Sequence, residues 1–403
     1  MSNSPDSDPW SATAGAVRDA LRRHLADDRP TALATVVDVE GSAYRRPGAK
    51  MAIPVDGESL GAVTAGCLEG PVADIGREVV ESDAPTVETF DLTDDGDDAW
   101  GLGLGCNGVI DVLVEPLDGS LRAPLDHLDD VRPVAVLTAV CETESVPVGA
   151  RATLTVDDEE DENDAAGGDR AWSPPAGTGA ADARPALPAD VVASLRERAL
   201  EFAAAGKSQT VRVETEDGDL SVFVDGLEPV AELLLFGNQN DVHPVARLGR
   251  EAGFRVTVAS ARGGRADADA FPHADRVVAT HPTDIDEVLE DPERTYAVLM
   301  SHNFLDDRLA LQTLLETDVP YVGLMGPRKR FEQLRDDLND DGVALSEADL
   351  ARIATPVGLD LGGGEPGQIA LSVVAEAVAV SNGRDGGRLA DRKGPIHPRD
   401  ESA

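Results

Sequence analysis

The chain has 403 residues, of which 76 are acidic and 35 basic, which gives a formal net charge of −41. This length exceeds what one hydrophobic core usually serves and predicts two or three domains. Because the chain carries few lysines and no basic stripe, it lacks the surface that releases counterions from phosphates, which argues against nucleic acids and anionic membranes as electrostatic partners. An acidic surface poor in lysine and aromatic residues is typical of proteins that stay soluble at high salt, so we expect a halophilic source.

Three cysteines are present, Cys67, Cys106 and Cys141, and no two of them form a C-x-x-C pair. This number and spacing indicate neither a disulfide framework nor a zinc ribbon, so we expect a reducing cytoplasm. The tail at residues 1–10 is polar and acidic, and no apolar run reaches the length of a membrane span. The sequence therefore predicts neither an export signal nor a membrane anchor.

Residues 11–227 predict a mixed α+β domain, in which amphipathic helical spacing alternates with buried strand-like runs and an Asp56-Gly57 pair marks a hairpin. An acidic stretch at 157–184 lacks apolar periodicity and is predicted to be a disordered insertion. In chain order, helices are expected at Thr13–Leu25, Leu68–Val80 and Ala189–Ala205, and strands at Thr31–Val39, Met51–Pro54, Ser59–Val63, Thr86–Leu92, Val109–Glu115, Pro133–Val140, Ala150–Val156, Thr210–Val213 and Leu220–Val224.

Residues 228–384 change to an alternation of apolar strands and amphipathic helices, followed by a tail at 385–403. This alternation predicts a Rossmann-like, doubly wound parallel sheet with right-handed crossovers, so the fold class of the whole chain is α/β. Strands are expected at Glu232–Phe236, Arg255–Ala259, Arg276–Ala279, Ala297–Met300 and Tyr321–Leu324, and helices at Val242–Ala252, Ile285–Leu289, Asp306–Leu315, Arg328–Leu338 and Pro366–Val380.

A thiol lies in each of two glycine turns of the first domain. Gly66-Cys67-Leu68-Glu69-Gly70 stands at the start of a predicted helix, where unpaired N–H groups favour a thiolate or a bound anion. Gly105-Cys106-Asn107-Gly108 opens a predicted strand. Either turn alone is explained equally well by tight backbone geometry around a small buried thiol. Their pairing within one short segment favours a site.

The loop between the first two predicted strands is locally basic in an acidic protein. It contains Arg45, Arg46 and Lys50, together with two glycines and a proline. Guanidinium groups match the geometry of phosphate oxygens, so the loop is a candidate for holding an anionic group.

The turn after the strand Glu232–Phe236 stands where a dinucleotide fingerprint would lie, but it keeps only the first glycine, Gly237. Gln239 and Val242 replace the second and third glycines, and Ser260 replaces the acidic residue that would hold a ribose. Three interpretations stay open: nicotinamide redox chemistry, binding of a modified phosphate ligand, or use of the sheet as a scaffold.

Two later turns follow strands of the same sheet, at the edge where ligands of open α/β sheets bind. His302 lies in the first turn, and the run Arg328-Lys329-Arg330 begins a helix after the second, which suits a phosphate. A capping or core role explains His302 as well as a ligand role does. A solvated helix start paired with Glu332 and Asp336 is the alternative for the three cations.

Several ordered motifs run across both domains. These motifs are Gly41-Ser42-Ala43-Tyr44-Arg45-Arg46-Pro47-Gly48-Ala49-Lys50-Met51, Gly66-Cys67-Leu68-Glu69-Gly70, Trp100-Gly101-Leu102-Gly103-Leu104-Gly105-Cys106-Asn107-Gly108, Tyr321-Val322-Gly323-Leu324-Met325-Gly326-Pro327-Arg328-Lys329-Arg330, Pro356-Val357-Gly358-Leu359-Asp360-Leu361-Gly362 and Glu365-Pro366-Gly367-Gln368-Ile369-Ala370-Leu371-Ser372. Together they resemble the XdhC/CoxI family of molybdoenzyme accessory proteins. The resemblance covers most of the chain except the tails and the acidic insertion. The chain departs from the family pattern mainly in the Rossmann half, at Gly237-Asn238-Gln239-Asn240, Ser260-Ala261-Arg262 and Ser301-His302-Asn303.

The resemblance implies a protein that binds the molybdenum cofactor, molybdopterin, and assists its sulfuration by a cysteine desulfurase. The resemblance also implies that the protein passes the cofactor to the large subunit of xanthine dehydrogenase or a related molybdenum hydroxylase. A protein with this role is a chaperone more than a catalyst. A homodimer is compatible with the family, and the Rossmann domain is a candidate for a nucleotide.

On this basis we expect Cys67 and Cys106 to face one pocket as molybdenum ligands. Arg45, Arg46 and Lys50 would donate to the pterin phosphate or to molybdate oxygens.

Two other functions stay open on the sequence. The Rossmann pattern is compatible with an NAD(P)-dependent oxidoreductase, and purely structural glycine turns would leave a cofactor-free interaction protein for a molybdoenzyme. A literal xanthine dehydrogenase activity is rejected, because three cysteines provide no clusters for iron–sulfur centres. The chain is also far shorter than a molybdopterin-binding catalytic subunit would be.

Overall fold

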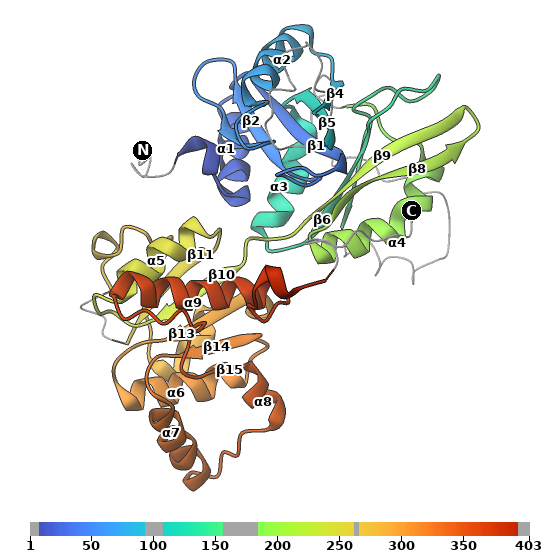
Figure 1. Ribbon diagram of the computed structural model, residues 1–403. Helices are drawn as coiled ribbons and strands as arrows, with labels where there is room; N and C mark the ends of the chain where they lie inside the picture. Colours follow the sequence, from blue (N-terminus) through green and yellow to red (C-terminus); the bar gives the residue numbers. More distant parts are fainter. Residues whose placement is uncertain (1–7, 93–107, 156–183, 262–265, 394–403) are drawn as a thin grey trace. The chain divides into compact units, whose positions relative to one another are not determined.

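The computed structural model describes residues 8–92, 108–155, 184–261 and 266–393. Gly105, Cys106 and the predicted insertion at 157–184, apart from Arg184, lie outside these residues. The chain forms two compact units that divide in the sequence between Pro229 and Val230 (Figure 1). Within the described ranges, every helix is too short or too polar to span a bilayer.

Two antiparallel sheets build the first unit, one of five strands in the order β3-β2-β1-β5-β4 and one of four strands in the order β7-β6-β9-β8. The strands are β1 (Thr31–Gly41), β2 (Lys50–Pro54), β3 (Leu60–Gly61), β4 (Thr86–Asp91), β5 (Gly108–Pro116), β6 (Val134–Ala139), β7 (Arg151–Thr155), β8 (Ser208–Thr215) and β9 (Gly218–Leu227). The helices are α1 (Ala14–Ala26), α2 (Glu69–Ser82), α3 (Arg122–Asp129) and α4 (Ala189–Ala205).

Each sheet of the first unit has one face against a helix and one face against the other sheet. In β1, Ala32, Ala34 and Val36 pack in the cluster under α2, whereas Val37 packs with Phe223 of β9. This explains why the strand is a continuous buried run, since successive side chains point to opposite faces and both faces are covered. Helices α1 and α3 contribute to a further cluster that borders both sheets.

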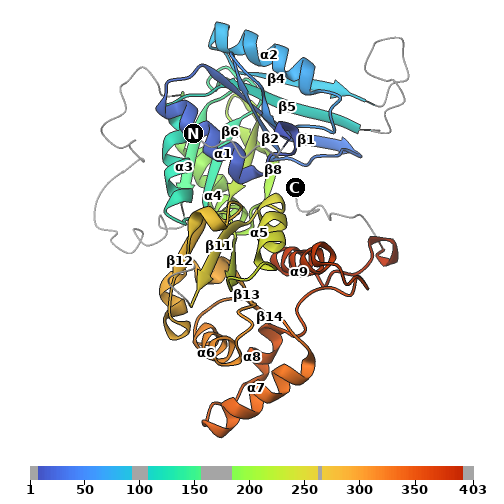
Figure 2. The ribbon, with the colours of Figure 1, turned by 90° about the vertical axis from the view of Figure 1, so that its left-hand side faces the viewer.

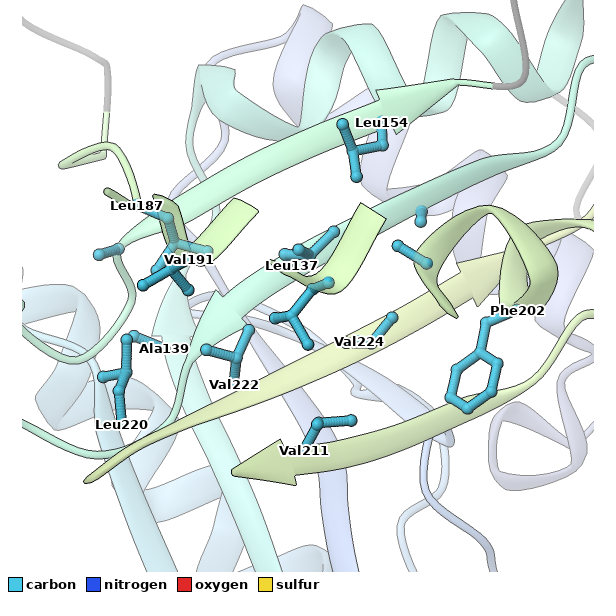
Figure 3. Packing of buried hydrophobic residues seen from close by; sticks show 14 of the residues in the cluster. Leu137, Ala139, Leu154, Leu187, Val191, Phe202, Val211, Leu220, Val222 and Val224 are labelled. Carbon is cyan, nitrogen blue, oxygen red and sulfur yellow. The ribbon is translucent and has the colours of Figure 1, made fainter. Parts of the chain in front are cut away.

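Helix α4 covers the other face of the four-stranded sheet. Figure 3 shows Leu137, Val222 and Val224 of β6 and β9 gathered with Val191 and Phe202 of α4. The predicted strands at Thr210–Val213 and Leu220–Val224 are the centres of the longer β8 and β9, and all of β8 pairs with β9. The short helix α3 was not predicted, because eight residues with an internal proline give little helical periodicity.

The second unit is a doubly wound parallel sheet, as predicted, and its six strands have the order β12-β11-β10-β13-β14-β15. The strands are β10 (Glu232–Phe236), β11 (Arg255–Ser260), β12 (Arg276–Ala279), β13 (Thr295–Leu299), β14 (Tyr321–Leu324) and β15 (Ile353–Ala354). Helices α5 (Val242–Glu251) and α9 (Pro366–Ser381) pack on one face, and α6 (Phe304–Leu315) and α7 (Arg328–Asp340) on the other (Figure 2).

Three elements of the second unit differ from expectation. The helix predicted at Ile285–Leu289 is a 3₁₀ segment, η6 (Pro282–Val288), with a non-helical residue, Asp284, inside it. Helix α8 (Glu347–Arg352) and β15 were not predicted, because six and two residues are too few to show a period.

Candidate functional site

Three segments of the first unit meet at one end of the five-stranded sheet. Strand β1 ends at Gly41 and its antiparallel neighbour β2 begins at Lys50, so the loop 42–49 lies at this end. Strand β3 runs antiparallel to β2 and ends with Gly61 beside Met51, so the turn 62–68 leaves from the same end. We call this region the loop end of the sheet.

The third segment reaches the loop end from β4 and β5. The Leu92 N–H donates to the Gly108 carbonyl at 3.0 Å, and Gly108 pairs with Gly41, the last residue of β1. A Cβ on Gly108 would lie 2.8 Å from the Ser42 carbonyl oxygen, so glycine is required where β5 passes the arginine loop. Gly105 and Cys106 precede Gly108 outside the described residues, and their part in a shared pocket stays a prediction.

Cys67 lies in a turn that Thr64 and Glu69 close. The Thr64 N–H and hydroxyl donate to the two carboxylate oxygens of Glu69 at 2.8 and 2.6 Å, and the Leu68 N–H donates to Thr64 Oγ1 at 3.1 Å. Gly66 has φ +111°, a conformation that side-chain-bearing residues rarely adopt. The thiol is half-buried beside the cluster under α2, just before that helix begins at Glu69.

The loop 42–49 carries Arg46 on a tight turn. The Ala49 N–H donates to the Arg46 carbonyl at 3.1 Å, and Pro47 and Gly48, the latter with φ +94°, are the residues that a type II turn favours at its two central positions. The Arg45 side chain is half-buried and that of Arg46 is exposed. Both therefore stand at the loop end, and their role as donors to a cofactor stays a prediction.

An aromatic pair stands beside these arginines. Tyr44 is 61% exposed, and its ring centroid lies 5.9 Å from that of Trp10. The indole Nε1 of Trp10 is buried and has no hydrogen-bond partner among the described residues. Neither ring is among the predicted site residues, although Tyr44 lies within the arginine motif.

Lys50 does not share a site with Cys67. Its ammonium donates to Asp225 Oδ2 of β9 at 2.6 Å and to the Gly48 carbonyl at 3.1 Å. The next residue, Met51, packs under α2, so the alternation of a strand directs Lys50 to the face opposite Cys67. The prediction that Lys50 is a donor in the Cys67 pocket is therefore wrong, because Lys50 instead joins the two sheets.

The space beside Lys50 is too small for a cofactor. A cavity of about 40 Å³ lies between the two sheets, with Lys50, Glu115, Arg151 and Asp225 among its lining residues. This volume admits a few waters at most, whereas sites for drug-sized ligands have about 300–1,000 Å³. Among the described side chains, no group of three or more His, Cys, Asp or Glu residues could hold a metal ion.

In the second unit, Gly237 and His302 lie after β10 and β13, the neighbouring strands at which the strand order reverses. A Cβ on Gly237 would lie 2.6 Å from the Met300 carbonyl oxygen, so close packing of the chain requires this glycine. His302 has φ +59°, and its Nε2 lies 2.7 Å from Asp241 Oδ2. The structure thus gives both residues structural contacts at the switch point of the sheet.

Asp241 is the residue at the N-terminus of α5, the first crossover helix. In nucleotide-binding Rossmann sheets the pyrophosphate lies at this helix terminus. A carboxylate here repels such a group, and Asn238 donates to Ser260 Oγ at 2.8 Å in the place where a ribose would be held. These contacts weigh against binding of a dinucleotide.

The three cations at the start of α7 have different environments. Arg328 and Lys329 are exposed, whereas Arg330 donates to Asp307 Oδ2 at 2.7 Å and its guanidinium lies 5.6 Å from the Phe304 ring. The Asp307 side chain is 2% exposed and also accepts from the Ser301 hydroxyl at 2.5 Å. Arg330 is therefore structural, and Arg328 and Lys329 keep the role of phosphate donors only as a prediction.

Part-buried hydrogen bonds join the motifs that contain Tyr321 and Gly358 to Glu376 of α9. The Tyr321 hydroxyl donates to Glu376 Oε2 at 2.5 Å, and the Gly358 N–H donates to the same oxygen at 2.8 Å. Burial, together with this carboxylate, raises the pKa of Tyr321 well above its usual range. The neutral phenol is therefore a fixed donor that joins β14, the loop after β15 and α9.

Both halves of the chain match families of known proteins. Residues 24–91 match the XdhC and CoxI family, and residues 233–377 match the XdhC Rossmann domain. The chain is 28% identical over 361 residues to a Bacillus subtilis protein that is described as a probable subunit of xanthine dehydrogenase, covering 89% of this chain and 95% of that protein. It is 30% identical over 189 residues to the uncharacterized protein YqeB of Escherichia coli, covering 45% of this chain and 32% of that protein.

A solved structure has the same fold over nearly the whole chain. It is described as a xanthine dehydrogenase from Bacillus halodurans and shows 25% identity with a TM-score of 0.69, covering 93% of this chain and 98% of that one. The order of the matched segments agrees with the order of the two units described above. The chain belongs to the XdhC and CoxI family.

Proposed function

We propose that this protein is an accessory protein of xanthine dehydrogenase or a related molybdenum hydroxylase, and that it carries the molybdenum cofactor as cargo. It binds the cofactor at the loop end of the five-stranded sheet, presents it for sulfuration by a cysteine desulfurase and passes it to the hydroxylase. The observation that carries the proposal is the meeting of the Cys67 turn, the arginine loop and the chain after Cys106 at one place. The names of the relatives from the two Bacillus species support the link to xanthine dehydrogenase.

The chemistry of the loop end suits this cargo. A soft thiol such as Cys67 is a ligand for molybdenum or an acceptor for sulfur, and the guanidinium groups of Arg45 and Arg46 match the phosphate of molybdopterin. The exposed ring of Tyr44 offers a face on which a flat pterin ring stacks. The cofactor would bring the molybdenum centre, and the chain would supply the groups that hold and orient it.

The composition favours a carrier over a hydroxylase. An iron–sulfur cluster takes four ligands, most often cysteines, and the chain has three cysteines in all. Cys141 accepts the Ser221 N–H at 3.0 Å and packs against the cluster under α4, whereas Cys67 packs against the cluster under α2. We therefore assign the oxidation chemistry to a partner enzyme.

The purified protein is expected to contain molybdenum and a pterin when it is expressed in cells that make the cofactor. Elemental analysis for molybdenum and fluorescence of the oxidised pterin measure both, with protein from cells that lack molybdopterin synthesis as the control. Molybdenum and pterin at the control level would contradict the proposal. If a hydroxylase large subunit is nevertheless captured, the protein is an interaction partner without a cofactor.

Neither NADH nor NADPH is expected to bind with saturation in calorimetric titration. The carboxylate of Asp241 at the start of α5 repels the pyrophosphate, and Ser260 offers no carboxylate to a ribose. Binding of either nucleotide at micromolar concentration would instead support an oxidoreductase that uses the second unit.

A further inference from the structure

The turn that carries Arg46 is packed against the four-stranded sheet. A Cβ on Gly48, the third residue of this turn, would lie 2.7 Å from the hydroxyl oxygen of Ser208 at the start of β8. The Gly48 N–H donates to the Val36 carbonyl of β1 at 2.8 Å. The turn is thus held between its own sheet and the second sheet, at a position that only glycine fills without displacing Ser208.

Asp225 is the centre of this contact. Its Oδ2 accepts from the Lys50 ammonium at 2.6 Å and its Oδ1 accepts from the Ser208 hydroxyl at 2.7 Å. Lys50 donates in turn to the Gly48 carbonyl at 3.1 Å. The side chains of Lys50 and Asp225 are 16% and 8% exposed, so solvent ions screen this pair far less than a surface pair. A chain of hydrogen bonds therefore runs from β9 to the arginine turn.

A second contact fixes the strand that leads into the loop. The pairing of β1 with β5 shifts its register between Val36 and Asp38, which leaves Val37 outside the ladder. The Val37 carbonyl accepts instead from the Thr210 hydroxyl of β8 at 2.8 Å. This bond holds β1 and not the turn that carries Arg46. Its removal is therefore a control for removal of the Asp225 contact.

We infer that Asp225 is a positioning residue, which acts through Lys50 to hold the Arg46 turn in the conformation that binds the cargo. Asp225 does not itself lie at the loop end on the Cys67 side, because Lys50 and its partners occupy the opposite face of the sheet. The part of this inference that concerns cargo rests on the proposed function. The part that concerns the order of the turn stands on the contacts alone.

The test is hydrogen exchange of the full-length protein with Asp225→Asn. The Gly48 N–H is bonded to the Val36 carbonyl of β1 and the Ala49 N–H to the Arg46 carbonyl within the turn. Exchange of both amide protons is expected to become at least about tenfold faster, as read from peptides that cover residues 42–50. Trypsin cleavage after Arg45 is expected to speed up in parallel. Thr210→Val is the matched control, in which the turn is expected to exchange as in the wild type.

A double variant distinguishes the loss of positioning of the Arg46 turn from the effect of leaving a buried charge unpaired. Lys50→Met combined with Asp225→Leu leaves no charge behind, so the fold is expected to keep a stability close to that of the wild type. The Gly48 carbonyl still loses its donor, so fast exchange in the turn is expected to persist. Protection of the turn at the wild-type level in this double variant, or in Asp225→Asn, overturns the inference.

Binding of isolated molybdenum cofactor distinguishes failure of the inference from failure of the proposed function. Asp225→Asn is expected to bind about tenfold more weakly than the wild type, as Arg46→Ala does. If Arg46→Ala weakens binding and Asp225→Asn does not, Asp225 is no positioning residue for the cargo. If the wild-type protein itself does not bind the cofactor, the proposed function fails, and the exchange rates alone decide whether Asp225 orders the turn.

Discussion

Replacing Glu115 by Gln is expected to lower the free energy of unfolding of the first unit by about 3–5 kcal/mol, because it leaves a buried arginine without its counter-charge. Arg151 donates to both carboxylate oxygens of Glu115 at 2.6 Å, and the two side chains are 5% and 3% exposed. Its other nitrogens donate to the hydroxyls of Ser120 at 2.7 Å and Thr138 at 3.3 Å, which are neutral and cannot balance the charge.

The Glu115–Arg151 pair also has a large effect because of its place in the fold. Glu115 belongs to β5 of the five-stranded sheet and Arg151 to β7 of the four-stranded sheet, so loss of the pair loosens one sheet from the other. Unfolding in urea, followed by tryptophan fluorescence, measures this directly. All three tryptophans, at positions 10, 100 and 172, precede Val230, so the signal reports the first unit alone.

Two further variants test whether burial of the ion pair causes this loss of stability. Asp130→Asn breaks the pair with Arg132, which has a similar distance of 2.7 Å but side chains 65% and 42% exposed, and it is expected to cost less than about 1 kcal/mol. Glu115→Leu with Arg151→Met removes both buried charges and is expected to recover most of the lost stability. Equal effects of Glu115→Gln and Asp130→Asn would show that burial does not govern the pair.

The second unit could be predicted almost completely, because its elements follow from local patterns. The predicted and observed bounds of β10, Glu232–Phe236, and of β14, Tyr321–Leu324, are the same. Strands β10, β13 and β14 are each followed by a helix, α5, α6 and α7. This alternation of apolar strands and helices leaves few arrangements other than a doubly wound parallel sheet. The contacts of Arg330 with Asp307 were missed, since a buried acidic residue in a helix leaves no periodic sign in the sequence.

The first unit could be predicted only in its parts. Its strands are visible as apolar runs, but no local pattern indicates that the runs form two sheets packed face to face. The turn around Cys67 was recognised because Gly66 and the helix after it are local features. The loop end followed from strand directions, which only the pairing of β1 with β2 and β5 establishes.

Lys50 shows why a motif can mislead about a site. It follows Arg45 and Arg46 closely in the sequence, yet it is the first residue of β2, where a shift by one position changes the face of the sheet. Its partner Asp225 lies 175 residues further along the chain. The arginine motif itself shows neither the face of the sheet on which Lys50 lies nor its distant partner, Asp225.

Replacing Cys67 by Ala is expected to weaken binding of isolated molybdenum cofactor at least about tenfold, which corresponds to about 1.4 kcal/mol. Cys67 is the only thiol that the described residues place at the loop end, and its replacement removes a soft ligand from that site. The side chain is half-buried, and α2 begins after Leu68 without a side-chain cap, so the fold is expected to tolerate the change.

Cys141→Ala is the matched control, because Cys141 is also a partly buried free cysteine but packs in the cluster under α4. It is expected to bind the cofactor like the wild type, while Cys67→Ser, which keeps the size and loses the soft sulfur, is expected to bind as weakly as Cys67→Ala. The affinities are measured at high salt by titration with the isolated cofactor. Full affinity in both Cys67→Ala and Cys106→Ala would show that neither thiol is a ligand, and the arginines and Tyr44 would then be left to hold the cargo through its phosphate and its ring.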